Sequence, residues 1–399
     1  MILYPTQQRI VDLAKPNFLY ACDTGTGKSL MALHHYLKHN KGEPLLIVAP
    51  PSKAKEGGWN REVKFVEETY KISFAYAVEK YSTLSKKWTD YKGYFVVFDE
   101  CHYIKNSTSQ RGKAAFLLAK NSTHFILLSA TPTPNGYEDF INYFKMFNFT
   151  KNKSQFNSTY GIWGEGYAQG GRSFKKIIDY KHTKELDKLY QSISVTIKKE
   201  EMLDLKPITF KKVFFKPSKE YKTILNDNML DDEVFDTMPK LLSGLRQYAN
   251  TKGKIEYIKE FLEGTTRNVV IFYNFKHEVE ALKEIIQKEL YFVNGEGMKL
   301  PPKDEWKDIT NSVTLVQYQA GSAGIELQYA SEVIYYSPTY SYSDYQQSLG
   351  RCYRNGQGKK VTVYQFETKG TIERAVWKAL ANKQNFDEKM YQLTKLGGK

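Results

Sequence analysis

The stretch that most constrains the fold is Asp23–Ser29, which reads Asp-Thr-Gly-Thr-Gly-Lys-Ser. It follows the apolar run Phe18–Ala21, which predicts a strand, and precedes Leu30–Leu37, which predicts a helix. Such a turn binds anions, because its backbone N–H groups and the positive end of the helix dipole face the ligand. The sequence therefore predicts a phosphate-binding loop for ATP, although Cys22 stands where the strict pattern has glycine. Its contact residues are Thr24, Gly25, Thr26, Gly27, Lys28 and Ser29.

Two of these residues have defined chemical roles in a loop of this kind. Lys28 is expected to reach the β- and γ-phosphates and to act in catalysis, and the Ser29 hydroxyl is expected to bind Mg²⁺. The alternative is a glycine-rich turn that binds nothing, and the stretches that follow argue against it.

Continuous apolar runs recur after this loop, at 44–51, where two prolines end the run, and at 94–98 and 124–128. Runs of this kind are typical of parallel strands that are buried on both faces, and helical patterns separate them. The run at 94–98 ends in Asp99 and Glu100. We expect Asp99 to hold Mg²⁺ and Glu100 to orient and deprotonate the attacking water. The run at 124–128 leads to Ser129 and Thr131, whose hydroxyls are expected to sense the γ-phosphate.

The second half of the chain begins a new set of predicted strands, and no second phosphate-binding loop occurs in it. The strands are expected at 208–215, 269–273, 313–316, 333–336 and 361–364. We therefore expect an α/β chain of two tandem RecA-like, doubly wound parallel-sheet domains, 1–200 and 201–399, of which only the first holds its own nucleotide site. Arg351 and Arg354 are spaced to share one helix face, where guanidinium groups can stabilise phosphoryl charge.

Three local strings give the chain a family resemblance. Asp99–Asn106 resembles an extended DEAH box, 129–135 resembles a Thr-Pro-x-x-Asn segment, and Trp59–Glu62 resembles a Trp-x-x-Glu motif. In this order they resemble the Swi/Snf-type DNA translocases of helicase superfamily two. The stretch 347–357 resembles the arginine-finger motif of that family, and 321–327 resembles its glycine-rich motif, with Ser322 and Glu326 where the family prefers glycine and asparagine.

The resemblance implies a role for further residues. Gln7 falls where the family reads adenine, and Gly324 falls in a motif that meets ribose and DNA. Arg351 and Arg354 would act on the ATP as catalytic arginine fingers. Residues implied in coupling are His102, Ser129, Thr131 and Gln347. Residues implied in DNA binding are Ser52, Lys53, Trp59, Ser82, Thr83, Asn274, Gly321 and Ser322.

Net charge points to the same kind of partner. With 58 Lys and Arg against 44 Asp and Glu the formal charge is +14, which fits a nucleic acid but also fits a solvated lysine-rich surface. The expected partner is double-stranded or branched DNA, in repair, recombination or replication. We expect a monomer in the cytoplasm, or in the host cytoplasm if a phage encodes the chain. No membrane span or secretory signal is visible.

Other features leave alternatives open. The three cysteines suit neither zinc nor a disulfide framework and are best explained as small buried residues. Residues 149–174 carry glycines and aromatics and are expected to form a flexible surface loop, with a DNA contact as the lesser alternative. Two other functions remain: an RNA helicase or single-strand unwinder on the same scaffold, and a binding module without enzymatic activity.

Overall fold

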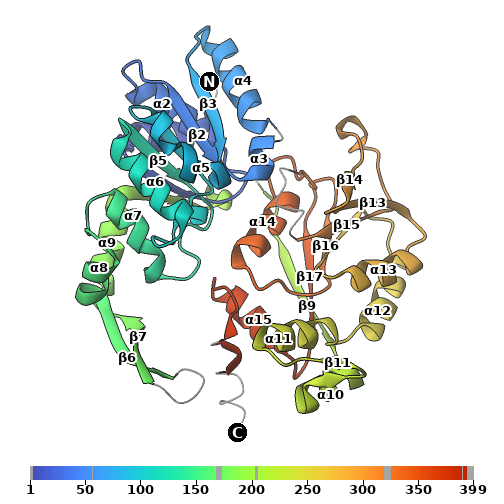
Figure 1. The fold of residues 1–399 in the computed structure, drawn as a ribbon. Helices are drawn as coiled ribbons and strands as arrows, with labels where there is room; N and C mark the ends of the chain where they lie inside the picture. Colours follow the sequence, from blue (N-terminus) through green and yellow to red (C-terminus); the bar gives the residue numbers. More distant parts are fainter. Residues whose placement is uncertain are drawn as a thin grey trace. The chain divides into compact units, whose positions relative to one another are not determined.

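The computed structural model describes residues 3–55, 57–167, 173–202, 205–318, 325–388 and 390–392. The chain divides into two compact units, Met1–Met202 and Leu203–Lys399 (Figure 1). Both units are α/β, as predicted, and each is built around its own sheet. No helix in these described ranges is long and apolar enough to cross a membrane.

The sheet of the first unit is six-stranded in the order β3-β2-β4-β5-β1-β8, and all of its strand pairs are parallel. Its strands are β1 (Phe18–Cys22), β2 (Leu45–Ala49), β3 (Tyr76–Lys80), β4 (Phe95–Asp99), β5 (His124–Leu128) and β8 (Ser194–Ile197). The helices of this unit are α1 (Pro5–Leu13), α2 (Lys28–His39), α3 (Pro51–Lys55), α4 (Gly58–Tyr70), α5 (Tyr81–Lys87), α6 (Gln110–Asn121), α7 (Phe140–Met146), α8 (Lys153–Tyr160) and α9 (Thr183–Ile193).

Both faces of this sheet are buried, which explains the continuous apolar runs. In β1, Tyr20 and Cys22 pack into a core shared with α1, α2 and α4, whereas Leu19 and Ala21 pack into a second core shared with α5 and α6. Side chains alternate between the faces of a strand, so a strand covered on both sides must be apolar at every position.

Part of the first unit differs from the expectation. Residues 149–174 were expected to form a flexible loop, but they contain α8 and the start of an antiparallel hairpin of β6 (Gly161–Tyr167) and β7 (Ser173–Tyr180). The edge strands β3 and β8 were also missed, because their exposed positions carry polar residues and break the apolar pattern.

The sheet of the second unit has seven strands in the order β14-β13-β15-β12-β16-β17-β9, and all pairs are parallel except β13 with β14. These strands are β9 (Thr209–Phe215), β12 (Val269–Tyr273), β13 (Glu289–Asn294), β14 (Gly297–Lys299), β15 (Ser312–Gln317), β16 (Glu332–Tyr335) and β17 (Thr362–Thr368). The helices are α10 (Lys219–Asp227), α11 (Met238–Gln247), α12 (Lys252–Glu263), α13 (Lys276–Ile285), α14 (Tyr342–Cys352) and α15 (Ile372–Ala381), and a small hairpin, β10 (Met229–Leu230) with β11 (Glu233–Val234), follows α10.

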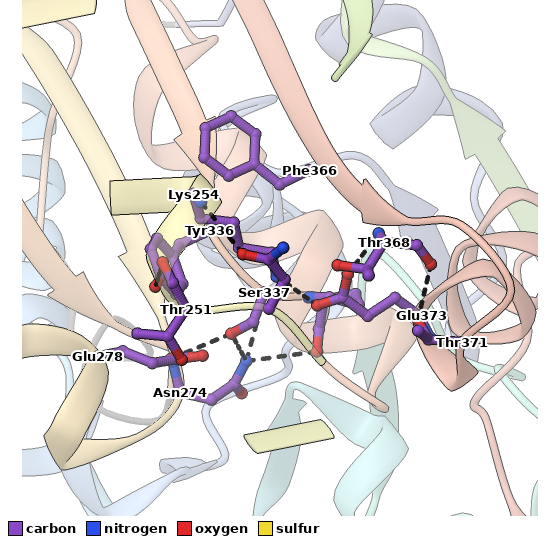
Figure 2. A network of polar contacts seen from close by, with 12 residues as sticks. Thr251, Lys254, Asn274, Glu278, Tyr336, Ser337, Phe366, Thr368, Thr371 and Glu373 are labelled. Carbon is purple, nitrogen blue, oxygen red and sulfur yellow. Dashed lines mark hydrogen bonds and ion pairs between the residues drawn. The ribbon is translucent and has the colours of Figure 1, made fainter. Parts of the chain in front are cut away.

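A buried ion pair joins two helices of the second unit. Lys254 of α12 donates to Glu373 of α15 over 2.5 Å, and the two side chains are 2% and 0% exposed. Glu373 also accepts from the backbone N–H of Thr368 at the end of β17 (Figure 2). The pair ties the end of β17 to helices on both sides of it, because α12 and α15 pack into different cores.

Candidate active site

The phosphate-binding loop lies between the end of β1 and the start of α2, as predicted. Gly25 and Gly27 adopt φ angles of 80° and 73°, a left-handed conformation that favours glycine. At Gly27 a second constraint applies, since a Cβ there would lie 2.5 Å from Nε2 of Gln7. The loop therefore needs glycine at 27 both for its turn and for the close approach of a neighbouring side chain.

Gln7 anchors α1 to this loop. Its Oε1 accepts from the backbone N–H of Tyr4 at 2.7 Å, and its Nε2 donates to the carbonyl of Thr26 at 2.8 Å. The side chain is buried, as is Thr26, whose hydroxyl donates to the carbonyl of Asp23. Gln7 thus positions the loop in this structure, and its contact with adenine stays a prediction.

Lys28 points back over the loop. Its ammonium donates to the carbonyl oxygens of Cys22 at 2.7 Å and Asp23 at 2.9 Å. Burial lowers the pKa of Lys28, and the negative charges of Glu100 and Asp99 act against that shift. Because the two hydrogen-bond acceptors are neutral carbonyls, they leave the positive charge of Lys28 free to attract a phosphate. This arrangement suits a triphosphate.

Asp99, at the end of β4, is 1% exposed and surrounded by donors. Trp59 of α4 donates its indole N–H to Oδ2 of Asp99 at 2.9 Å, and the Lys53 ammonium lies 3.1 Å from the same oxygen. Tyr81 donates its hydroxyl to the backbone carbonyl of Asp99 at 2.7 Å. A buried carboxylate needs such partners, and here two of them come from the segment that follows β2.

Glu100 follows directly, with φ 53°, a left-handed conformation that is uncommon for a residue with a side chain. Lys53 lies 3.4 Å from its Oε1, and His102 Nδ1 lies 3.4 Å from its Oε2. Burial is the largest single influence on the pKa of Glu100 and raises it, but Lys53, His102 and Lys28 outweigh burial and hold this pKa well below its usual range. Glu100 is therefore ionised at neutral pH.

Three of the predicted coupling residues form a chain of contacts from Glu100. The Ser129 hydroxyl lies 3.4 Å from Oε2 of Glu100 and 3.2 Å from Nδ1 of His102. The backbone N–H of Thr131 donates to the Ser129 hydroxyl at 3.1 Å. Ser129 and Thr131 are buried, and these contacts connect Glu100 to the segment that follows β5.

Two residues that stabilise this region were not predicted from the sequence. The Tyr143 hydroxyl of α7 donates to the backbone carbonyls of Pro132 at 2.8 Å and Cys101 at 3.2 Å, and so links the ends of β4 and β5. Asp139 accepts from Lys105 at 2.9 Å and from the backbone N–H of Asn135 at 2.8 Å. Tyr143 reads in the sequence only as one apolar position of a helix, and nothing marks Asp139 as different from a surface acid.

The contacts of Trp59 and Lys53 correct their predicted role. Trp59 was expected to bind DNA, but its side chain is 3% exposed and its only polar atom points at Asp99. Lys53 was also expected to bind DNA, but its ammonium lies on Asp99 and Glu100. Ser82 is exposed, and Thr83 donates to Glu79 at 2.7 Å, so the DNA contacts of these two stay predictions. The side chain of Ser52 lies outside the described part.

In the second unit the two arginines do not share a helix face. Arg351 is in α14, but this helix ends at Cys352, so Arg354 lies beyond it. Tyr353, the C-cap, has ψ 85°, which ends the helical path. Arg354 instead pairs with Glu326 at 3.3 Å, and Glu326 also pairs with Lys303. Gln347 is within α14 and donates to Ser343 at 3.1 Å.

Asn274 follows β12 and faces the end of β16 (Figure 2). Its amide nitrogen donates to the Ser337 hydroxyl at 2.8 Å, and Glu278 accepts from the Ser337 hydroxyl at 3.1 Å and from the backbone N–H of Asn274 at 2.8 Å. This network fixes the loop, and a DNA contact of Asn274 stays a prediction. Gly321, Ser322 and Gly324 lie outside the described residues.

Comparison with known proteins gives two domain matches in series. The SNF2-related domain matches residues 64–254, and the helicase conserved C-terminal domain matches residues 253–356. Together they span the DEAH-like box, the segments after β5 and the arginine motif, and the first match begins after the phosphate-binding loop.

Several known proteins are similar over most of the chain. An uncharacterized ATP-dependent helicase of Mycoplasma pneumoniae is 25% identical over 93% of this chain and 40% of its own length. The uncharacterized ATP-dependent helicase YqhH of Bacillus subtilis is 22% identical over 96% of this chain and 78% of its own length. The DNA annealing helicase and endonuclease ZRANB3 of Bos taurus is 22% identical over 92% of this chain and 38% of its own length.

The chain thus spans less than half the length of two of these three relatives.

Among solved structures, the Sulfolobus solfataricus SWI2/SNF2 ATPase core in complex with dsDNA aligns with 96% of this chain and 91% of its own, at 21% identity and a TM-score of 0.44. With the two domain matches in the order that the motifs predicted, the chain belongs to the Swi/Snf-type family of ATP-dependent helicases in superfamily two.

Proposed function

We propose that this protein couples the hydrolysis of Mg-ATP to movement along double-stranded or branched DNA, in repair, recombination or replication. The observation that carries the proposal is the contact chain Glu100–His102–Ser129, set beside Asp99 at the end of one sheet. An ionised, buried glutamate linked to the next strand end suits a residue that activates water and reports the event to its neighbours.

We assign a separate role in ATP hydrolysis to each of several residues of the first unit. Lys28 and the start of α2 would hold the phosphates, and Asp99 with Ser29 would hold Mg²⁺, which usually takes one or two protein ligands besides phosphate oxygens and water. Bound Mg-ATP supplies the phosphoanhydride whose hydrolysis drives movement. Glu100 would accept a proton from water, and Gln7 would keep the loop in position through Thr26.

The Lys53 ammonium supplies a positive charge beside Asp99 and Glu100, where we propose that Mg²⁺ binds. This ammonium pairs with both Asp99 and Glu100 in this structure and offsets one of their two negative charges, and a metal ion at Asp99 would compete with it for that carboxylate. Arg351 and Arg354 would stabilise charge on the transferring phosphoryl group, and Arg354 must then exchange its partner Glu326 for phosphate.

DNA is the proposed track because of the family, the name of the ZRANB3 relative and the charge of +14. Contacts of lysine with phosphates release counterions, so binding should weaken steeply as salt rises. Ser52, Ser82, Thr83, Asn274, Gly321 and Ser322 remain the proposed DNA contacts.

The test is the ATPase rate of the purified chain with blunt duplex, single-stranded, forked and four-way DNA and with RNA duplex. We expect the strongest stimulation with double-stranded or branched DNA, and none of it in Glu100→Gln. The matched control is Glu68→Gln, because Glu68 is an exposed glutamate of α4 with only a surface ion pair to Lys64.

Each alternative gives a different outcome in the same assay. Stimulation by RNA alone would replace the proposal with an RNA helicase, and stimulation by single strands alone would indicate a single-strand motor. If the chain binds DNA but no nucleic acid stimulates hydrolysis, it is a binding module. Movement itself is read by displacement of a triplex-forming strand from a duplex.

A further inference from the structure

The β6–β7 hairpin extends from the end of α8 in the first unit (Figure 1). Its strands pair Gly164 with Lys176 and Gly166 with Phe174, with a register shift between Ile162 and Trp163. Opposite residues of an antiparallel pair share a face, so β6 presents two glycines where β7 presents large side chains.

The glycines let those side chains lie across the partner strand. A Cβ at Gly166 would meet the Phe174 ring at 2.9 Å and the Lys176 side chain at 2.9 Å, and a Cβ at Gly164 would meet Ile178 at 2.8 Å. The Phe174 side chain therefore lies close to the backbone of Gly166, yet it is 50% exposed, and Ile178 is 56% exposed.

The opposite face carries a second open ring. Trp163 is 51% exposed and pairs with Ile177, and on the same face Glu165 pairs with Lys175. Each face of the hairpin thus combines a half-exposed aromatic ring with a lysine. We call the side chains of Trp163, Phe174, Lys175, Lys176 and Ile178 the patch.

Hydrogen bonds and ring packing attach the base of the hairpin to the first unit. The backbone N–H of Lys181 donates to the carbonyl of Tyr160 at 2.7 Å, and the Tyr160 hydroxyl donates to Glu185 of α9 at 2.9 Å. Tyr180 at the end of β7 packs against Tyr137 and Phe156 of the unit's helical side. The apolar side chains beyond this base have no core of their own in the described part of the chain, because the nearest aromatic cluster ends at Tyr180.

Exposed rings interleaved with lysines have a specific chemical use. Bases that are not paired offer both of their flat faces, aromatic side chains stack on them without regard to sequence, and lysines contact the intervening phosphates. A duplex does not offer these base faces, because its bases already stack on one another.

We propose that the β6–β7 hairpin binds unpaired DNA on both faces, with a base stacked on Phe174 and a phosphate at Lys176 on one face, and a base stacked on Trp163 and a phosphate at Lys175 on the other. It would thereby select branched DNA, where unpaired strands meet duplex. The proposal rests on the DNA motor function proposed above, but it concerns a surface outside the ATP site. A protein partner would instead use the apolar character of the patch and not the flatness of its rings.

The experiment measures the affinity of the chain, without nucleotide, for fluorescent oligo-dT, for a fork with two dT arms and for a blunt duplex. The variants are Trp163→Leu with Phe174→Leu, which keeps apolar bulk, and Trp163→Tyr with Phe174→Tyr, which keeps the rings. Phe65→Ala is the matched control, because Phe65 is an aromatic of the same unit that is 49% exposed on α4. Circular dichroism and thermal melting establish that each variant is folded.

We expect the leucine variant to bind oligo-dT and the fork about fivefold more weakly for each ring lost, the low end of measured base stacking, and to bind the blunt duplex as before. The tyrosine variant and Phe65→Ala should bind all three like the parent chain.

Unchanged oligo-dT affinity in the leucine variant overturns the proposal, as does an equal loss on the blunt duplex. If the leucine variant keeps its affinity and the tyrosine variant does not, the patch acts through apolar contact and suits a protein. The ATPase rates on blunt duplex and on the fork are measured in parallel: their absence on both in the parent chain would overturn the proposed function, whereas the oligo-dT result decides the hairpin alone.

Discussion

Trp59→Phe tests whether the indole of α4 positions the Asp99 carboxylate that we propose binds Mg²⁺. The substitution removes the N–H that donates to Asp99 over 2.9 Å and leaves an aromatic ring in the same pocket. Water cannot easily replace the donor, because Asp99 is 1% and Trp59 3% exposed. A hydrogen bond to a charged group contributes about 1.5–3 kcal/mol, which corresponds to roughly a 10- to 150-fold change in an equilibrium constant.

Lys53 remains beside Asp99 in this variant, but a lysine on a flexible stem orients a carboxylate less strictly than an indole. We therefore expect the Mg²⁺ concentration for half-maximal ATPase activity to rise about tenfold, the lower end of that range. The dependence on ATP at saturating Mg²⁺ should change much less. The assay is a Mg²⁺ titration of DNA-stimulated hydrolysis, with the free energy of unfolding measured in parallel.

The control is Trp306→Phe in the second unit, where the indole N–H donates to the backbone carbonyl of Pro301 at 3.2 Å. It removes the same chemical group from a neutral acceptor, so it should cost stability without moving the Mg²⁺ titration. A folded Trp59→Phe with an unchanged Mg²⁺ titration would refute the role given to the indole. If Trp59→Phe and Trp306→Phe shift the Mg²⁺ titration by the same amount, the indole of Trp59 acts through stability alone.

Four further outcomes are expected. Glu100→Gln should bind ATP in equilibrium dialysis yet hydrolyse it very slowly, and near-normal turnover would contradict its assignment. Lys53→Met should move the acid limb of the ATPase pH profile to higher pH. Among the charges around Glu100, Lys53 lowers its pKa the most, and the carboxylate is lost as pH falls through that pKa. Arg354→Ala should keep ATP affinity while hydrolysis falls by about 10³–10⁵, and a loss only in DNA affinity would contradict this. Burial lowers the pKa of His35 to about 3, so as pH falls the unfolded chain binds a proton at this histidine before the folded chain does. The free energy of unfolding should therefore fall below pH 6.5 by up to about 1.4 kcal/mol per pH unit. His35→Phe should reduce this dependence, measured in denaturant titrations at pH 7 and pH 5.

The parts of the fold that could be predicted are those whose sequence pattern has one explanation. The strands before Lys28 and Asp99 are buried on both faces and therefore uniformly apolar. The cysteines were expected to be small buried residues, and all three are buried and free. The hairpin was missed because its β6 glycines suppress the alternating pattern that marks a strand, although those same glycines are what allow Phe174 to lie close to the β6 backbone.

The candidate site was predictable in its motifs but not in its pairings. Sequence shows that Lys53 and Trp59 follow a strand, but it cannot show that α3 and α4 turn both side chains toward the next strand's Asp99. It likewise cannot show that Tyr353 ends α14 early and leaves Arg354 with Glu326. Such pairings depend on helix ends and on long-range contacts, which local spacing does not contain.

The pairing of β9 with β17 bears on how the chain is made. The first strand of the second unit lies beside the last one, and Lys254 awaits a partner 119 residues further on. On the ribosome the first unit has all of its strands once Ile197 has emerged, so it can fold while the rest is being translated. The second unit cannot complete its sheet and its buried ion pair until Glu373 has left the exit tunnel. Until then β9 lacks its partner strand β17, and Lys254, which is buried in the folded unit, stays accessible to chaperones and proteases.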